Sequence, residues 1–259
     1  KNNFSKKFLS SKKPLVIIGE SLLEITSGQF IFEEMKEFLM NNNFINENWN
    51  ALNILLQNAS SVGCIDLNLL SYTEENNFIF FDKLLKNEFK LIYLLGSDNL
   101  KINKNNEFIV YQGSHGDRGA EIADVVLPSP AYTEQEGLYS NLEGKVQQCR
   151  KASYPTGEAL EDWKIFNLIS KNLDNNELIK DYTLLKKEAL EQIPNFSKID
   201  HLPNKKLNLN KKKKSMFTDQ VVNINIIDYY YTNAISRSSK TMAECRVVKN
   251  KTLKDGTNN

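Results

Sequence analysis

Residues 107–150 constrain the fold more than any other part of this chain, because short strand-like segments alternate there with turns marked by glycine and proline. Residues 108–111 and 124–127 have the β-branched and aromatic composition that is typical of strands. Between these two segments stand three evenly spaced glycines, Gly113, Gly116 and Gly119. Their G-x-x-G-x-x-G spacing differs from the dinucleotide-binding pattern, and the G-K-S/T of a phosphate-binding loop is missing. A structural loop beside a sheet is therefore favoured over a ligand loop, because glycines collect at such turns whatever the function.

Other apolar segments predict further strands. Residues 14–19 and 89–96 are short apolar runs that end in glycine, as buried parallel strands do. Residues 136–148 predict a β-hairpin with a tight turn at Gly144. The apolar segment 78–81 fits a helix or a strand equally well.

The spacing of apolar residues predicts helices over residues 30–40 and 49–62. Another helix is predicted to begin at Thr156 or Gly157. Its first turns carry three acidic residues that would stabilise the helix dipole, Glu158, Glu161 and Asp162. Because strands alternate with helices, the sequence predicts an α/β fold with a doubly wound, mostly parallel sheet.

A change in composition after about residue 172 divides the chain into an α/β domain, residues 1–172, and an irregular C-terminal extension, residues 173–259. The extension is rich in lysine and asparagine, which favours packing on the body of the protein or on a neighbour over a core of its own. A helix is predicted over residues 171–192.

The rest of the extension gives weaker predictions. The four-lysine run 211–214 is typical of a solvated loop, and residues 221–227 alternate like a strand. Residues 228–245 form a polar, extended tail with three adjacent tyrosines, which is more aromatic than a free tail needs. We therefore expect this tail to pack against another element or subunit.

Charge and composition exclude several classes of function. The net charge of +1 gives no field that would attract nucleic acid. Apolar runs of the ~18–20 residues needed to span a bilayer are missing. The three cysteines, Cys64, Cys149 and Cys245, are far apart in the sequence, which argues against iron–sulfur clusters and structural zinc and favours reduced, buried thiols. Without an initiator Met or a signal peptide, the sequence is expected to be part of a longer chain.

The glycine-rich loop also contains ionisable residues. His115 and Asp117 could form a base and carboxylate pair, but one loop does not identify the nucleophile that such a pair would serve. We expect Asp117 instead to form an Asx turn or to pair with Arg118, which would hold the loop in place. No catalytic residue and no metal ligand is assigned from the sequence.

Four segments, in the same order along the chain, resemble the C-terminal part of the large iron–sulfur subunit family of respiratory complex I (the 75 kDa or NuoG type). These segments are 14–21, 49–63, 111–128 and 228–245. The strongest resemblance is the run from Tyr111 to Pro128, YQGSHGDRGAEIADVVLP.

The resemblance implies a molybdopterin-oxidoreductase-like fold that serves as a non-catalytic scaffold and binds no cofactor of its own. It implies 2Fe-2S and 4Fe-4S clusters in an N-terminal region outside this sequence, and FMN in a flavoprotein partner subunit. The expected partners are these and other matrix-arm subunits, with no nucleic acid and no membrane span. The expected location is the matrix side of the mitochondrial inner membrane, in an NADH:ubiquinone oxidoreductase.

An alternative is the C-terminal fragment of a molybdopterin-dependent oxidoreductase similar to formate dehydrogenase. The hairpin is similar to one that lies beside the pterin in such enzymes, and this reading would give cofactor contacts to Asn141, Glu143 and Gln147. The scaffold is favoured because the extension is too short for a further cofactor-closing domain. In addition, Lys145 stands where such enzymes commonly carry arginine, which alone can form a bidentate contact.

Overall fold

The computed structural model describes residues 2–59, 61–67, 69, 83–98, 100, 102–174, 179–193, 198–203, 216–219 and 228–254. The chain forms two compact units, each assembled from separate stretches of sequence. The first unit comprises residues 1–70, 138–148 and 190–224, and the second comprises residues 71–137, 149–189 and 225–259. Three segments with expectations from the sequence, 78–81, 211–214 and 221–227, lie outside the described residues.

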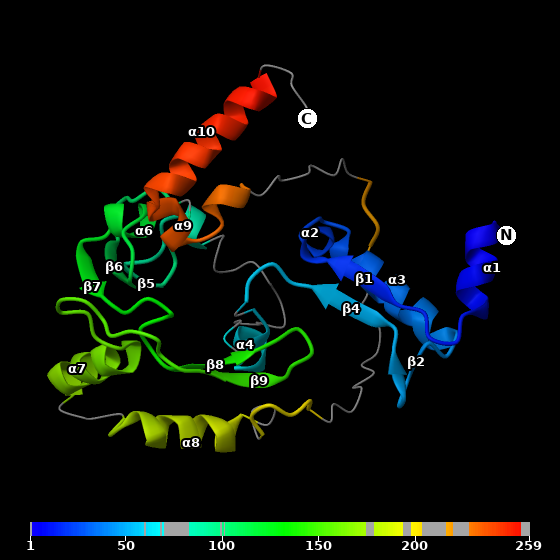
Figure 1. The fold of residues 1–259 in the computed structure, drawn as a ribbon, viewed down its shortest axis with the longest axis horizontal. Helices are drawn as coiled ribbons and strands as arrows, with labels where there is room; N and C mark the ends of the chain where they lie inside the picture. The colour runs from blue at the N-terminus through cyan, green and yellow to red at the C-terminus, as the bar shows by residue number, and fades with distance from the viewer. Residues whose placement is uncertain are drawn as a thin grey trace. The chain divides into compact units, whose positions relative to one another are not determined.

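The first unit is built on a parallel strand pair. β1 (Val16–Gly19) pairs with β4 (Leu52–Leu55), with Val16 opposite Leu52 and Gly19 opposite Leu55. Two helices, α2 (Glu20–Leu23) and α3 (Gly28–Asn41), connect the two strands and precede the antiparallel pair β2 (Ile45–Asn46) and β3 (Trp49–Asn50) (Figure 1). The predicted strand over 14–19 and the predicted helix over 30–40 are confirmed.

The helix predicted over residues 49–62 is wrong. This segment forms β3 and β4, and the helix α4 (Ser61–Asp66) begins only near its end. The apolar residues of β4 fit helical spacing, but they also alternate in burial once the strand pairs with β1. Asn50 and Asn53 have low helix propensity, and the parallel ladder supplies the backbone hydrogen bonds, so tertiary pairing decides the structure.

The core of the first unit lies under α3. It consists of four buried side chains, those of Leu39, Phe44, Ile45 and Ala51. The short helix α1 (Asn3–Ser10) packs Phe8 against this core, where its ring meets Phe44 edge to face at 5.6 Å.

The second unit contains a three-stranded parallel sheet. Its strands are β5 (Leu91–Leu95), β6 (Phe108–Gly113) and β7 (Val125–Pro128), and β6 is the central one. The predicted strands over 89–96, 108–111 and 124–127 are therefore confirmed. Five buried residues form the core of this unit, Ile92, Leu94, Ile102, Ile109 and Tyr111.

The fold is a mixed α/β arrangement with small, mostly parallel sheets. Parallel pairs are joined through helices, as the sequence predicts for βαβ units. In the described residues they form two separate sheets, one in each unit.

The predicted hairpin is confirmed as β8 (Gly137–Ser140) and β9 (Val146–Cys149), which form a two-stranded sheet. Gly144 adopts φ +78° in the turn, a conformation that glycine adopts without steric cost.

The predicted helix boundaries after the hairpin are wrong. α7 (Asp162–Asp174) begins at Asp162 instead of Thr156 or Gly157, because Gly157 adopts φ +59° and the Leu160 N–H donates to the carbonyl of Pro128. Of the three predicted acidic residues, Asp162 alone lies in the first turn. The helix expected over 171–192 is two helices, since α7 ends at Asp174 and α8 begins at Tyr182.

The tail is helical rather than extended. A 3₁₀ turn over Tyr229–Tyr231 is followed by α9 (Ala234–Ser238) and α10 (Lys240–Lys254). Asn233 caps α9 through a capping box with Ser236, a local signal of a helix start that is present in the sequence. Among the described helices, none has the length and apolar character needed to cross a bilayer.

The expectation of buried thiols is also wrong. Cys64 and Cys149 are partly exposed and Cys245 is exposed, and all three are free. Burial of cysteine is a statistical tendency, and it is overridden here because each residue lies on a short or outward-facing element.

Asp124, at the start of β7, predicts a pH dependence of stability. Its carboxylate pairs with Lys104 and accepts a 2.8 Å hydrogen bond from the Ile109 N–H. The hydrogen bond from Lys104 and that from the backbone hold the pKa of Asp124 below its ordinary value of 3.8. A lowered folded-state pKa contributes stability that is present above the unfolded pKa and is lost as the pH falls through the folded value.

We expect Asp124→Asn to be less stable than the parent at pH 7, with the difference shrinking below about pH 4, where the unfolded carboxyl becomes protonated. Urea unfolding of both proteins at pH 7, 5 and 3 measures this. A difference that stayed constant over this range would contradict the prediction.

Candidate functional site

Tyr111 forms the centre of the glycine-rich loop. It lies on β6, is 1% exposed, and its hydroxyl is hydrogen-bonded to the Asp98 carboxylate and lies 2.8 Å from the His115 carbonyl oxygen. Burial, followed by the hydrogen bond to Asp98, raises the pKa of Tyr111 far above its ordinary value of 10.0. The phenol therefore stays protonated and joins the strand to the two loops that follow β5 and β6.

The glycines of this loop are needed because other groups of the protein approach them closely. A side chain at Gly113 would overlap the phenol of Tyr111. A Cβ at Gly119 would lie 2.7 Å from the Ser97 carbonyl oxygen and 3.0 Å from the Tyr111 ring. The Gly119 N–H also donates to the Asp98 carbonyl at 3.0 Å. Two of the three glycines thus serve internal packing, in line with the structural role favoured from the sequence, and Gly116 alone faces open space.

Asp117 is held by the C-terminal tail. Its carboxylate pairs with the guanidinium of Arg237, which also donates to the Tyr231 carbonyl at 3.3 Å. The expectation that Asp117 pairs with Arg118 or forms an Asx turn is wrong, because Asp117 precedes α6 (Arg118–Glu121) without a side-chain capping bond. The expectation that the tail packs against another element is confirmed, since Arg237 connects it to the glycine-rich loop across 120 positions of sequence.

The tail is stabilised at a second point by cation contacts. Arg246 of α10 pairs with Asp228 and lies 4.7 Å from the centre of the Tyr231 ring, while Lys249 lies 5.6 Å from that of Tyr230. The hydrogen bond from Arg246 holds the pKa of Asp228 below its ordinary value. Two of the three adjacent tyrosines are thus used as faces for cations, which accounts for the aromatic content of the tail.

This clamp gives a testable consequence. Arg237→Ala removes the cation that joins the tail to Asp117, so we expect the tail to open more often and to be cut sooner by protease. Limited trypsin digestion followed by mass spectrometry measures the cleavage rate at the lysines of α10, with an expected increase of about threefold to tenfold.

The control is Lys240→Ala, which removes an exposed cation at the start of the same helix without touching the Asp117 pair. Equal cleavage rates in the parent and in Arg237→Ala would show that the ion pair does not hold the tail.

His115 does not form a pair with Asp117. Its ring Nδ1 lies 2.9 Å from the Ser114 hydroxyl, whereas the Asp117 carboxylate contacts Arg237. The base and carboxylate pair considered from the sequence is therefore not formed by these two residues.

The hairpin residues of the alternative reading lie around an exposed turn. The side-chain oxygen of Asn141 accepts hydrogen bonds from the N–H groups of Glu143 and Lys145, at 3.0 and 2.9 Å. The side chains of Glu143 and Gln147 are exposed. The structure thus brings Asn141 and Glu143 together through the backbone of the turn, and it places Gln147 on the following strand β9.

Sequence reasoning missed a second buried network, centred on Gln112. This side chain is 0% exposed, and it accepts a hydrogen bond from the Tyr93 hydroxyl and donates one of 2.6 Å to Asp162. Burial, followed by the charge of Asp162, raises the pKa of Tyr93. The network joins β5, β6 and the N-terminus of α7, and the apolar neighbours of Gln112 in the strand could have indicated an inward-facing amide.

Metal binding needs several ligating side chains in one place. Among the described residues, no group of three or more histidine, cysteine, aspartate or glutamate side chains is close enough to hold an ion. The clusters that do form, around Tyr111 and Gln112, consist of hydrogen bonds and ion pairs within the protein.

Two family models match this sequence. The one described as molybdopterin oxidoreductase matches residues 1–172. The one that describes the C-terminal region of the NuoG-type subunit of NADH-ubiquinone oxidoreductase matches residues 194–245.

Curated relatives cover nearly the whole chain. The NADH-ubiquinone oxidoreductase 75 kDa subunit of Reclinomonas americana is 40% identical, over 93% of this chain and 35% of its own length. The mitochondrial 78 kDa subunit of Neurospora crassa is 35% identical, over 95% of this chain and 34% of its own length. The NuoG-type subunit of the NADH-quinone oxidoreductase of Rickettsia bellii is 33% identical, over 94% and 34%. This chain thus spans about a third of the length of the relatives it matches.

Proposed function

The chain belongs to the molybdopterin oxidoreductase family and corresponds to the C-terminal region of the 75 kDa (NuoG-type) subunit of complex I, and we propose that it is a non-catalytic scaffold of that subunit. In this role it supports the transfer of electrons from NADH to quinone by holding neighbouring parts of the peripheral arm in place. It performs no redox chemistry itself.

The observation that carries the proposal is how the glycine-rich loop is filled. Tyr111 packs against two of its glycines, and Arg237 of the tail binds its aspartate. A ligand loop would direct its backbone N–H groups and charged side chains toward open space. Here those groups hold together parts of the protein that are distant in sequence, as a scaffold requires.

A pterin cofactor does not fit the candidate residues as the structure places them. Asn141 uses its side-chain oxygen within the turn, and Glu143 and Gln147 lie on an exposed hairpin. Cofactor sites in proteins are concave and largely desolvated, with fixed polar groups that converge on the ligand. We therefore assign no step of the reaction to these three residues.

The redox groups belong to other parts of the assembly in this proposal. The relatives include a potato protein named as an iron–sulfur protein of NADH dehydrogenase. We place the 2Fe-2S and 4Fe-4S clusters in the N-terminal region of the large subunit, outside these residues, and FMN in the flavoprotein partner. Both are neighbours of this chain in the peripheral arm on the matrix side of the mitochondrial inner membrane.

We also infer how the chain is organised. Residues 1–172 form the part of the molybdopterin-like domain present here, and its two small parallel sheets belong to a doubly wound sheet that is completed by the rest of the subunit. Residues 173–259 form an extension that packs on this body or on neighbouring subunits. The match of a separate C-terminal family model to residues 194–245 supports this division.

A second candidate is the C-terminal fragment of a molybdopterin-dependent oxidoreductase similar to formate dehydrogenase. The match of the molybdopterin oxidoreductase model over residues 1–172 is the observation that favours it. The fit of the hairpin residues argues against it, because they do not converge on an enclosed site.

A native gel of detergent-solubilised membranes, probed for this chain and stained for NADH oxidation, tests the scaffold proposal. We expect the chain to migrate with the large NADH-oxidising band. Migration as a small species separate from that band would exclude the scaffold role and favour the second candidate.

A further inference from the structure

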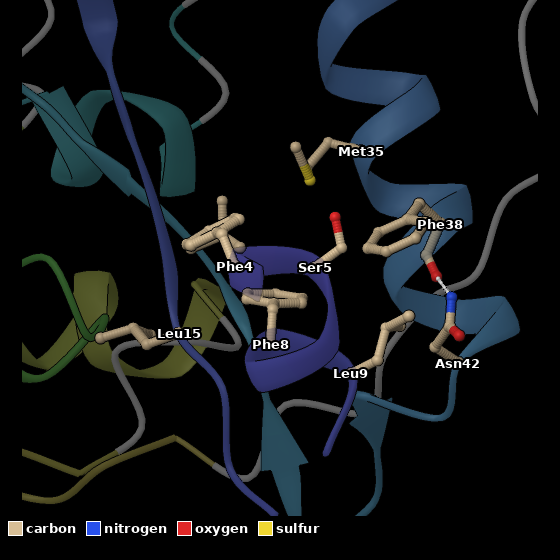
Figure 2. Close-up of a pocket in the computed structure, with 9 residues that line it drawn as sticks. Phe4, Ser5, Phe8, Leu9, Leu15, Met35, Phe38 and Asn42 are labelled. Carbon is tan, nitrogen blue, oxygen red and sulfur yellow. Dashed lines mark hydrogen bonds between the residues drawn. The ribbon is translucent and has the colours of Figure 1, made fainter. Parts of the chain in front are cut away.

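An apolar groove lies between α1 and α3 in the first unit. It has a volume of about 690 Å³ and is lined by side chains of α1, of α3 and of the residues that lead into β1. Figure 2 shows Phe4 and Phe8 of α1 on one side and Met35 and Phe38 of α3 on the other. These apolar side chains face a space that the described part of the chain leaves open.

Several residues of the groove are more exposed than apolar side chains usually are. Phe4 is 73% exposed, Leu15 51% and Phe38 42%. Scattered apolar residues are normal on a protein surface, but a contiguous patch usually marks a contact site. Phe8 anchors α1 to Phe44 and Phe38, so α1 presents Phe4 from a fixed position rather than from a free end.

The groove is not built for a small polar ligand. Its two polar residues, Ser5 and Asn42, are satisfied within the protein, because the Ser5 hydroxyl donates to Asn2 and the Asn42 amide donates to the Phe38 carbonyl, both at 2.8 Å. Figure 2 shows the second bond directed along α3. A small-molecule site needs polar groups that orient the ligand, so this lining fits apolar side chains of a polypeptide instead.

Charge indicates the kind of polypeptide. The α1 side of the groove carries four exposed lysines, Lys6, Lys7, Lys12 and Lys13, and residues 1–19 contain no aspartate or glutamate. A groove of aromatic, leucine and methionine side chains between two helices is suited to the apolar face of an amphipathic helix. Acidic residues along the flank of that helix would complement the lysines of α1.

We propose that this groove docks an acidic amphipathic helix from the part of the large subunit that lies outside these residues. The inference rests on the proposed function, and the length of the relatives supports it, since the matched region is only 35% and 34% of two of them. The remaining two-thirds of such a subunit has to be held against this domain. A groove that is already formed, apolar and basic at its rim provides a contact for it.

Photo-crosslinking in cells that make the whole complex tests this. The photoreactive residue p-benzoylphenylalanine replaces Phe4, and in a matched control it replaces Tyr154, an aromatic residue that is 76% exposed and lies outside the groove. We expect the probe at position 4 to capture peptides of the cluster-bearing region of the large subunit. We expect the probe at position 154 not to capture them.

A charge change in the groove gives a second readout. With the probe at Phe38, the further substitution Leu15→Glu is expected to lower the yield of the same cross-link about tenfold, because it places a buried carboxylate against an apolar helix face. Met216→Glu, at a residue that is 83% exposed and outside the groove, is expected to leave the yield unchanged.

The outcomes separate this inference from the proposed function. If the chain migrates with the NADH-oxidising band but position 4 captures a second copy, another subunit or nothing beyond the control, the groove has a different role and the scaffold proposal stands. If the chain does not migrate with that band, both proposals fail.

Discussion

Gly119→Ala is expected to destabilise the second unit by about 3 kcal/mol, because overpacking a fixed backbone contact costs about this much. The new Cβ would lie 2.7 Å from the Ser97 carbonyl oxygen, which is backbone and cannot rotate away. It would also lie 3.0 Å from the ring of Tyr111, whose hydroxyl is fixed by Asp98. The loop could accept the methyl group only if the Gly119–Asp98 backbone hydrogen bond and the Tyr111 contacts moved together.

Urea unfolding followed by circular dichroism measures the loss of stability. The control is Gly116→Ala, at the glycine of the same loop whose side chain would meet open space, and we expect a change within about 0.5 kcal/mol. Similar stabilities for the two variants would mean that the close approach of Ser97 and Tyr111 does not exist in solution.

Gln112→Ala is expected to cost about 3 kcal/mol, because it leaves two buried hydrogen-bonding partners unsatisfied and opens a small cavity. The amide lies between the Tyr93 hydroxyl and the Asp162 carboxylate, and its side chain is fully buried. Removing it leaves Asp162 without the donor that connects α7 to the central strand. The stacked pair of Tyr93 and Phe166, with ring centres 5.8 Å apart, would then loosen as well.

Thermal and urea unfolding of Gln112→Ala and of Gln147→Ala compare a buried glutamine with an exposed one. Gln147→Ala is expected to stay within about 0.5 kcal/mol of the parent. Equal effects at the two positions would contradict the network that joins β5, β6 and α7.

Local patterns predicted the parallel strands well. The apolar runs before Gly19, Gly96 and Gly113 carry the strand signal within a few residues, so β1, β5 and β6 could be placed without tertiary information. The hairpin around Gly144 could be placed for the same reason, since its turn chemistry is local.

The segment from Trp49 to Leu55 could not be predicted in this way. Its apolar residues fit both helical and strand spacing, and pairing with β1 is what selects the strand. Similarly, α7 begins late because Leu160 bonds to Pro128, a contact that the sequence does not reveal. In both cases an interaction with a distant segment overrides the local preference.

The candidate site divides along the same line. The three glycines of the loop were recognised, and their structural role was favoured, because close packing at glycine is common beside a sheet. The partner of Asp117 was not found, since Arg237 lies 120 residues away and Arg118 is the nearest cation in sequence. Long-range ion pairs leave no periodic signal in a single sequence, and the networks around Tyr111 and Gln112 became visible only in three dimensions.

The measurement that tests the non-catalytic role most directly is the molybdenum and pterin content of the purified NADH-oxidising complex that contains this chain. Elemental analysis and pterin fluorescence, both normalised to the amount of this chain, provide it. The scaffold account predicts molybdenum and pterin far below one equivalent per chain in an active complex. One equivalent of each, retained through purification, would contradict it and would return Asn141, Glu143 and Gln147 to the role of cofactor ligands.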